Sequence, residues 1–131
     1  MWLNQFVRFA IFGRIRICLL FNKEFLSLPK NWPREEKYAL KDQVRRSSRS
    51  VGANIAEAWA KRRYPSHFVS KLCDADGELQ ETSHWLATAL ACEYIAEEQH
   101  ASFQKCIEEI GRSIGKMMSI PQKFTPKSTS Q

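Results

Sequence analysis

The regular spacing of apolar residues between positions 34 and 120 constrains the fold more than any other feature of the sequence. Apolar or small residues recur there every three or four positions, in three successive segments. Positions three and four apart lie on one side of an α-helix, so each segment predicts an amphipathic helix with one buried side. The predicted buried residues are Leu40, Val44, Ser48, Val51, Ile55 and Ala58; Phe68, Leu72, Ala75, Leu79, Thr82, Leu86 and Ala89; and Phe103, Ile107, Ile110, Ile114 and Met117.

Prolines mark the boundaries of these helices. Pro33 precedes an acidic first turn, Ser66 after Pro65 is the expected N-cap of the next helix, and Pro121 ends the last one. We predict helices over residues 4–28, 34–62, 66–94 and 98–120, and no segment has the two-residue period of a strand. The expected fold is all-α, an antiparallel up-down four-helix bundle in which residues 1–120 form a single domain. Residues 121–131 are expected to be a disordered tail.

The N-terminal apolar stretch does not have the pattern of a targeting or membrane-spanning segment. Arg8, Arg14 and Arg16 interrupt it, and no small-residue cleavage site follows. We expect a first bundle helix here. A basic amphipathic helix that lies on a membrane surface is the alternative.

The four cysteines predict neither a zinc site nor a disulfide framework. Cys18, Cys73, Cys92 and Cys106 form no Cys-x-x-Cys pair, and no histidines are spaced to complete a zinc site. We expect reduced thiols that pack as small hydrophobic residues in the cytoplasm.

Residues suited to catalysis are not arranged for it. Glu81 with His84, and Glu97 with His100, resemble the Glu-x-x-His pairs of di-iron bundles. In an antiparallel hairpin, however, the two pairs would lie about 15 Å apart along the axis. Two metals that share a site lie about 4 Å apart. With no nucleophile constellation and no glycine-rich phosphate loop either, we expect a protein that is not an enzyme and that holds no metal or cofactor.

Positive charge is concentrated in one segment. The chain has a formal charge of +6, and residues 34–63 hold nine basic against four acidic residues. Many of these cations recur every three or four positions, so they share one side of the helix and suit the phosphates of a nucleic acid. An ordinary solvated helix face is the alternative. The predicted nucleic-acid-binding residues are Arg34, Lys37, Lys41, Arg45, Arg46, Arg49, Lys61, Arg62 and Arg63.

A polar stripe lies beside this basic side. It predicts an interface that must specify its partner, either another helix of the bundle or another subunit. A surface helix with incidental polar residues is the alternative. Glu78 and Glu81 in the next helix are the expected partners of Arg46 or Gln43. The residues of the predicted interface are Gln43, Ser47, Ser50, Asn54, Glu57, Glu78 and Glu81.

The sequence of residues 32–63 resembles a known family. Pro33-Arg34-Glu35-Glu36-Lys37-Tyr38-Ala39-Leu40, Gln43-Val44-Arg45-Arg46-Ser47 and Ser50-Val51-Gly52-Ala53-Asn54-Ile55-Ala56-Glu57-Ala58 are similar to the four-helix-bundle proteins encoded in 23S rRNA intervening sequences. That family is similar to the accessory variability proteins of diversity-generating retroelements. Glu78-Leu79-x-Glu81-Thr82 and Ile110-Gly111-x-x-Ile114 extend the similarity. Residues 1–28, and Ala58 where the family often has glycine, depart from the pattern.

The resemblance implies a bacterial, cytoplasmic bundle that assembles as a ring-like homopentamer with basic surfaces. For the retroelement relatives it also implies binding to nucleic acid and to a reverse transcriptase. It brings no catalytic residues with it.

Together these features predict a non-catalytic homo-oligomer that binds the backbone of RNA or DNA, with RNA favoured, through the basic side of its second helix. The alternative is a structural adaptor that docks a protein such as a polymerase or reverse transcriptase, its charge serving solubility or steering. A third possibility is a membrane-surface protein that uses residues 1–25.

Overall fold

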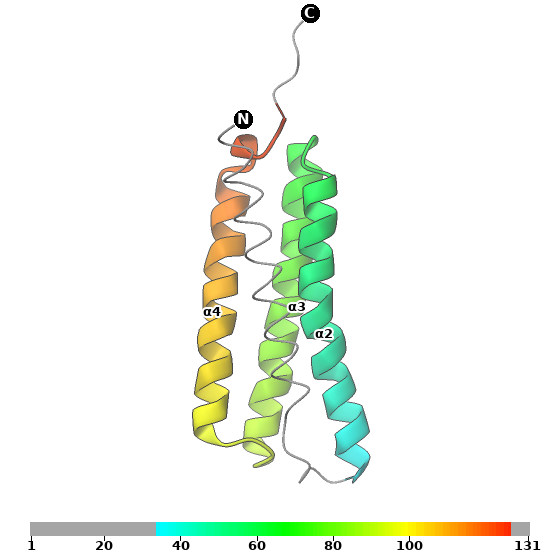
Figure 1. Cartoon of the computed structure of the whole chain (residues 1–131), viewed down its shortest axis with the longest axis vertical. Helices are drawn as coiled ribbons and strands as arrows, with labels where there is room; N and C mark the ends of the chain where they lie inside the picture. Colours follow the sequence, from blue (N-terminus) through cyan, green and yellow to red (C-terminus); the bar gives the residue numbers. More distant parts are fainter. Residues whose placement is uncertain (1–33, 127–131) are drawn as a thin grey trace, which may run out of the picture.

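The computed structural model describes residues 34–126, which form three long α-helices and one short 3-10 helix (Figure 1). The helices are α2 (Arg34–Ala60), α3 (Pro65–Ala91), α4 (Glu97–Ser119) and η1 (Pro121–Lys123). Residues 34–126 contain no strand, so the all-α prediction is confirmed for them. The fourth helix of the predicted bundle, at residues 4–28, lies outside the described residues.

The helix α3 packs against both α2 and α4, and consecutive helices run antiparallel (Figure 1). Short connections, residues 61–64 and 92–96, leave no room for any other arrangement. The contacts between α2 and α3 have the matching register: Arg46 pairs with Glu81, and Glu57 farther along α2 pairs with Lys71 earlier on α3.

The core lies along the side of each helix that the spacing predicts. Every residue listed above as a predicted core position is buried. Ser47 on α2 and Ile95 between α3 and α4 are buried as well, although the apolar spacing does not include them. Ser47 was expected in the polar stripe, and its burial shows that this stripe borders directly on the core.

The boundary between α2 and α3 differs from the prediction. Pro65 is the first residue of α3 and Tyr64 is its N-cap, so Ser66 already lies inside the helix. Proline suits this position because its fixed φ is helical and the first N–H of a helix has no partner to lose. The prediction of Ser66 as the cap was therefore wrong.

The end of α3 carries a local strain. Glu93 has a φ of 61°, in the left-handed region where glycine is usual. The N–H of Tyr94 donates to the carbonyl of Ala89 at 2.8 Å, and the N–H of Glu93 donates to that of Leu90 at 3.0 Å. These two bonds form the Schellman arrangement, which closes the helix and turns the chain toward α4.

The segment after α4 is more ordered than the sequence suggests. Disorder was expected from residue 121, but Pro121–Lys123 form η1, and the Phe124 ring stacks on the Phe68 ring with centroids 5.4 Å apart. The expectation therefore fails for residues 121–126, because one aromatic residue reaches the core. Residues 127–131 lie outside the described part of the chain.

The cysteines also depart from expectation. Cys73 and Cys92 are exposed and Cys106 is half-buried. Cys73 lies one position beyond the buried Leu72, and Cys92 follows the last residue of α3. The prediction of buried thiols was wrong for these two, because a helical pattern around a residue does not place it on the buried side.

Candidate nucleic-acid interface

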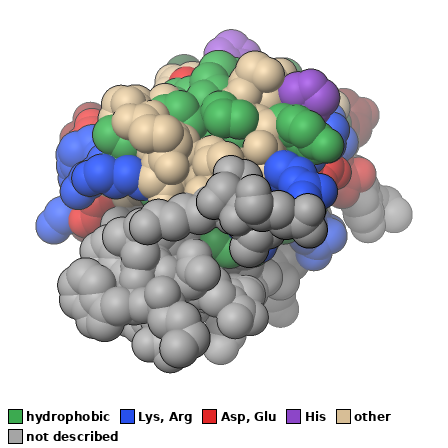
Figure 2. All heavy atoms as spheres, turned by 90° about the horizontal axis from the view of Figure 1, so that it is seen from above, with side chains coloured by type: hydrophobic (Ala, Val, Ile, Leu, Met, Phe, Trp, Pro, Cys, Tyr) green, Lys and Arg blue, Asp and Glu red, His purple; other side chains and the backbone are tan. Residues whose placement is uncertain are grey.

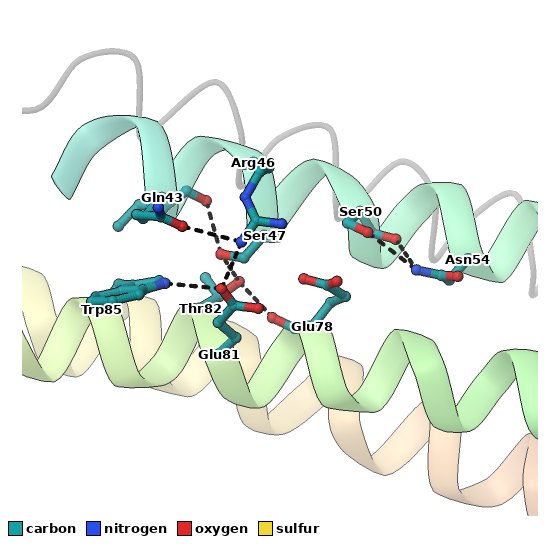
Figure 3. Close-up of polar contacts among 10 residues, drawn as sticks. Gln43, Arg46, Ser47, Ser50, Asn54, Glu78, Glu81, Thr82 and Trp85 are labelled. Carbon is teal, nitrogen blue, oxygen red and sulfur yellow. Dashed lines mark hydrogen bonds and ion pairs between the residues drawn. The ribbon is translucent and has the colours of Figure 1, made fainter. Parts of the chain in front are cut away.

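The polar stripe of α2 faces α3 (Figure 3). Arg46 Nη2 donates to Glu81 Oε1 at 2.8 Å and to Gln43 Oε1 at 3.1 Å, and Trp85 Nε1 donates to the same oxygen of Glu81 at 3.3 Å. Glu81 thus accepts hydrogen bonds from both helices. The expected pairing of Arg46 with a glutamate of the next helix is confirmed. Its guanidinium is engaged within the bundle, so we do not count it among the cations available to a ligand.

Two hydroxyl groups, those of Ser47 and Thr82, connect α2 and α3 next to this ion pair. Ser47 Oγ lies 2.8 Å from Thr82 Oγ1, and both residues are completely buried. Each hydroxyl also reaches a backbone carbonyl of its own helix, that of Val44 at 3.2 Å and that of Glu78 at 2.8 Å. Buried hydroxyls need such partners, and the single proton of Thr82 is shared between Ser47 Oγ and the Glu78 carbonyl. A small, satisfied polar pair at this depth allows only one register of α2 on α3.

Glu78 also belongs to this cluster, where burial of its carboxyl group is unfavourable. Its Oε2 atom is buried without a hydrogen-bond partner among the described residues. Burial raises the pKa of Glu78 above its usual value, and the neighbouring Glu81 carboxylate raises it further, while Arg46 and Ser50 oppose this shift to a lesser degree. The folded protein therefore holds a proton on Glu78 more tightly than the unfolded chain does.

The remaining stripe residues also make contacts within the chain. Lys71 Nζ on α3 lies 2.7 Å from Glu57 Oε2 on α2 and 3.6 Å from Asp74 Oδ2. The Lys71 ammonium lowers the pKa of Glu57 and is itself held charged by this pair. Asn54 Nδ2 donates to the carbonyl and the hydroxyl of Ser50 at 2.9 and 3.2 Å. The stripe is thus a contact between two helices of one chain.

Arg45 and Arg49 lie on α2 away from this contact. Arg45 is half-buried and Arg49 is exposed, and neither forms an ion pair with a carboxylate whose side chain is described within residues 34–126. They are four positions apart, so both point to one side of the helix. Lys41 is half-buried on the same side. The side chains of Arg34 and Lys37, which belong to the predicted set, lie outside the described part.

The described cations are not gathered on one side of the bundle. Viewed along the bundle, Lys and Arg side chains gather on two opposite sides, with hydrophobic and other polar side chains between them (Figure 2). Lys105, Arg112 and Lys116 of α4 are exposed cations too. The basic side of α2 is therefore one of several positive regions, and only a comparison between them can assign a ligand to it.

The turn between α2 and α3 holds the rest of the predicted set. The Arg62 guanidinium lies 4.0 Å from the centre of the Trp59 ring and donates to the Trp59 carbonyl at 3.0 Å. Lys61 and Arg63 on either side of it are exposed. Tyr64 follows, and this residue is 57% exposed.

The aromatic residues of this turn were not predicted as part of the site. The only sequence signal was their position, since Trp59 lies three residues before Arg62 and Tyr64 directly follows the basic cluster. A spacing of three on a helix brings a cation over a ring. The sequence did not indicate which of Lys61, Arg62 and Arg63 would lie over the Trp59 ring, because that depends on the path of the turn.

The Glu-x-x-His pairs do not assemble a metal site. Within residues 34–126, no group of three or more His, Cys, Asp or Glu side chains is placed to hold a metal ion. Glu81 is committed to Arg46 and Trp85, and the His84 ring packs edge-on against that of Trp85, with centroids 4.8 Å apart. In the same part of the chain, no helix has the length and apolar character that crossing a membrane requires.

Comparison with known proteins places the chain in a family. The family model described as 23S rRNA-intervening sequence protein matches residues 16–116. A solved structure, that of a protein with unknown function from the S23 ribosomal protein family of Bacteroides thetaiotaomicron, is 30% identical with a TM-score of 0.72. The match covers 84% of this chain and 98% of that one. No curated protein matches. The family match extends over most of the sequence, and the chain belongs to the 23S rRNA-intervening sequence protein family.

Proposed function

We propose that this protein is a non-catalytic, cytoplasmic RNA-binding protein that contacts backbone phosphates through cations of α2 and of the turn that follows it. The observation that carries the proposal is the contrast between Arg46, which is paired with Glu81, and Arg45 and Arg49, which have no ion pair within residues 34–126. A cation without a carboxylate partner can neutralise a phosphate without first breaking an existing contact.

RNA is favoured over DNA because the family takes its name from sequences that intervene in 23S rRNA. The phosphate contacts themselves carry no sequence information. We therefore expect affinity that depends on salt more than on sequence.

We further propose that the protein acts as a homo-oligomer, with five subunits as the resemblance implies. Repetition of the α2 cations around a ring would let several subunits hold one RNA, and the avidity gain would come without new contacts in each subunit. Light scattering coupled to size-exclusion chromatography would measure the subunit number directly. A monomeric mass would contradict this part of the proposal and leave the RNA contacts of a single chain to be tested separately.

The decisive test compares two charge-reversal variants with the same net charge. Arg45→Glu/Arg49→Glu alters the basic side of α2, and Lys105→Glu/Arg112→Glu alters exposed cations of α4. Fluorescence anisotropy with a labelled RNA hairpin and a matched DNA duplex would be measured over a series of salt concentrations. We expect the α2 variant to lose more than about tenfold in affinity, with a shallower salt slope, because each lost phosphate contact reduces the slope by about 0.7–0.9.

The α4 variant should stay within a few-fold of the wild type. Circular dichroism would verify that both variants keep their helices. Equal losses in the two variants would show that net charge alone attracts RNA. Absence of wild-type binding at low salt would remove the RNA-binding function.

A protein-docking adaptor is the second candidate, and the exposed small side chains of Ala53 and Ala56 on α2 favour it. They would let another helix approach closely. Docking of this kind should persist at salt concentrations that release RNA, since it depends on shape and apolar contact more than on charge. A polymerase or reverse transcriptase is the class of partner that the family resemblance suggests.

A further inference from the structure

The turn between α2 and α3 carries an exposed aromatic surface that phosphate binding does not explain. Tyr64 is the one large hydrophobic residue of the described part that is exposed, at 57%. Its ring contacts the ring of the exposed His67, with centroids 5.6 Å apart and planes tilted by 45°. A lone exposed tyrosine is common on protein surfaces. A pair of rings that directly follows two exposed cations, Lys61 and Arg63, is a more specific feature.

The backbone of Tyr64 is held on both sides. Its N–H donates to the Lys61 carbonyl at 3.0 Å, and its carbonyl accepts from the N–H of Phe68 at 2.9 Å. Pro65 follows as the first residue of α3 and restricts the chain further. The base of the tyrosine side chain is thus fixed before any ligand arrives, which lowers the entropy that binding must overcome.

The neighbouring Arg62 is not available to contact a ligand at this surface. Its guanidinium lies over Trp59 and donates to the carbonyl of that residue. The cations that the turn offers to a ligand are therefore Lys61 and Arg63. Both precede Tyr64 in the sequence, Lys61 by three positions and Arg63 by one.

We propose that the Tyr64–His67 ring pair stacks an unpaired base of single-stranded or loop RNA, while Lys61 and Arg63 contact the phosphates next to that base. The proposal deepens the RNA-binding function and rests on it, and it names the substrate class. Aromatic side chains bind nucleic acid without sequence preference because every base has a stacking face. Only unpaired bases are available for this, since the bases of an RNA duplex are stacked on each other.

The experiment uses two RNAs with the same number of phosphates, one unpaired and one a closed duplex, and the variants Tyr64→Leu and Tyr64→Phe. Leucine keeps apolar bulk but has no ring, and phenylalanine keeps the ring. We expect Tyr64→Leu to bind the unpaired RNA about fivefold to a hundredfold more weakly than the wild type, and the duplex with unchanged affinity. Tyr64→Phe should stay within about twofold of the wild type on both RNAs, because stacking needs the ring and not the hydroxyl.

A second readout reports stacking itself. An unpaired RNA with one 2-aminopurine should change in fluorescence when the wild type or Tyr64→Phe binds, and should not change with Tyr64→Leu. The salt slope should be the same for all three proteins, because the ring carries no charge. Thermal unfolding should also be the same, since the side chain is exposed.

The outcomes separate this proposal from the function on which it rests. If Tyr64→Leu binds the unpaired RNA as well as the wild type does, while Arg45→Glu/Arg49→Glu loses both RNAs, the stacking site is wrong and RNA binding stands. If the wild type binds neither RNA, the proposed function itself is wrong. If Tyr64→Leu weakens both RNAs equally, the turn contributes to general backbone binding and the preference for unpaired bases is overturned.

Discussion

The two sides of α2 use the same residue types for different purposes. On the side that faces α3, Arg46 pairs with Glu81 and the buried hydroxyls of Ser47 and Thr82 meet at 2.8 Å. One turn farther along α2, Arg49 is exposed and has no ion pair with a described carboxylate of residues 34–126. The contrast teaches that a row of cations in a sequence is not yet a binding surface, because a carboxylate on the next helix can engage some members of the row.

The largest expected difference between the two sides of α2 is the loss of stability caused by a larger side chain. Ser47→Leu places a larger side chain where α2 and α3 touch and where the wild-type residue is fully buried. Overpacking of this kind costs about 1–3 kcal/mol. In a domain of this size, each kcal/mol lowers the melting temperature by about 4–8 °C. Thermal unfolding followed by circular dichroism measures this loss.

The matched control is Ala53→Leu on the exposed side of the same helix. Leucine and alanine are both good helix formers, so its effect should stay within about 0.5 kcal/mol. Equal melting temperatures for the two variants would contradict the burial of the polar stripe.

A smaller effect is expected for alanine substitutions of Arg46 and Arg49, which should affect stability and RNA affinity in opposite orders. Arg46→Ala removes the partner of Glu81 and leaves two neighbouring glutamates, so it should destabilise the protein by up to about 1 kcal/mol. Arg49→Ala should change stability by less than about 0.5 kcal/mol. For RNA affinity the order should be reversed, with Arg49→Ala weaker and Arg46→Ala close to the wild type.

Urea unfolding and RNA anisotropy on the same two proteins would test both halves. The proposed difference between Arg46 and Arg49 is wrong if Arg46→Ala loses RNA affinity as strongly as Arg49→Ala while remaining fully stable. In that case the ion pair with Glu81 would give way to RNA, and Arg46 would return to the binding set.

The smallest expected effect depends on pH. Burial and the Glu81 carboxylate raise the pKa of Glu78 above 4.5, so the folded protein binds this proton more tightly than the unfolded chain does. The stabilisation from Glu78 is therefore complete below its ordinary pKa and is lost as the pH rises through the raised value. Glu78→Gln lacks this dependence, and its amide can donate to Glu81.

We expect Glu78→Gln to match or exceed the wild type in stability at neutral pH, by no more than about 0.5 kcal/mol, and to lose this advantage in acid. Glu57, whose pKa is lowered by Lys71, contributes in the opposite direction, but it does so in both proteins and cancels in the difference. Denaturant unfolding at several pH values measures that difference. A gap that stays constant with pH would show that Glu78 does not titrate differently in the folded state.

Apolar spacing was sufficient to predict the core of α2, α3 and α4. Every predicted core position is buried, because a helix can bury only residues that recur at its own period. The three helix ranges differ from the prediction by three residues or fewer at each end. The ends themselves were less predictable. Glu93 adopts a left-handed conformation that a glycine would normally indicate in a sequence. The Phe124 ring packs on Phe68 in a segment whose composition suggests disorder.

The candidate site was predictable only in part. The residues of the polar stripe and of the basic side were identifiable, since helical spacing assigns each residue to a side of α2. Their roles depended on the neighbouring helix. The pairing of Arg46 with Glu81 joins residues far apart in the sequence, and the ring contact of Tyr64 with His67 depends on where α2 ends and α3 begins.

Local periodicity was thus enough to establish an α-helical chain with an apolar side on each helix and a basic, polar second helix. Those features follow from interactions within one or two turns of the backbone. Tertiary packing alone decided which cations are paired, which carboxyl group is buried and which aromatic rings reach the surface. Each of these depends on the register and orientation of one helix against another, and contacts between distant residues set both.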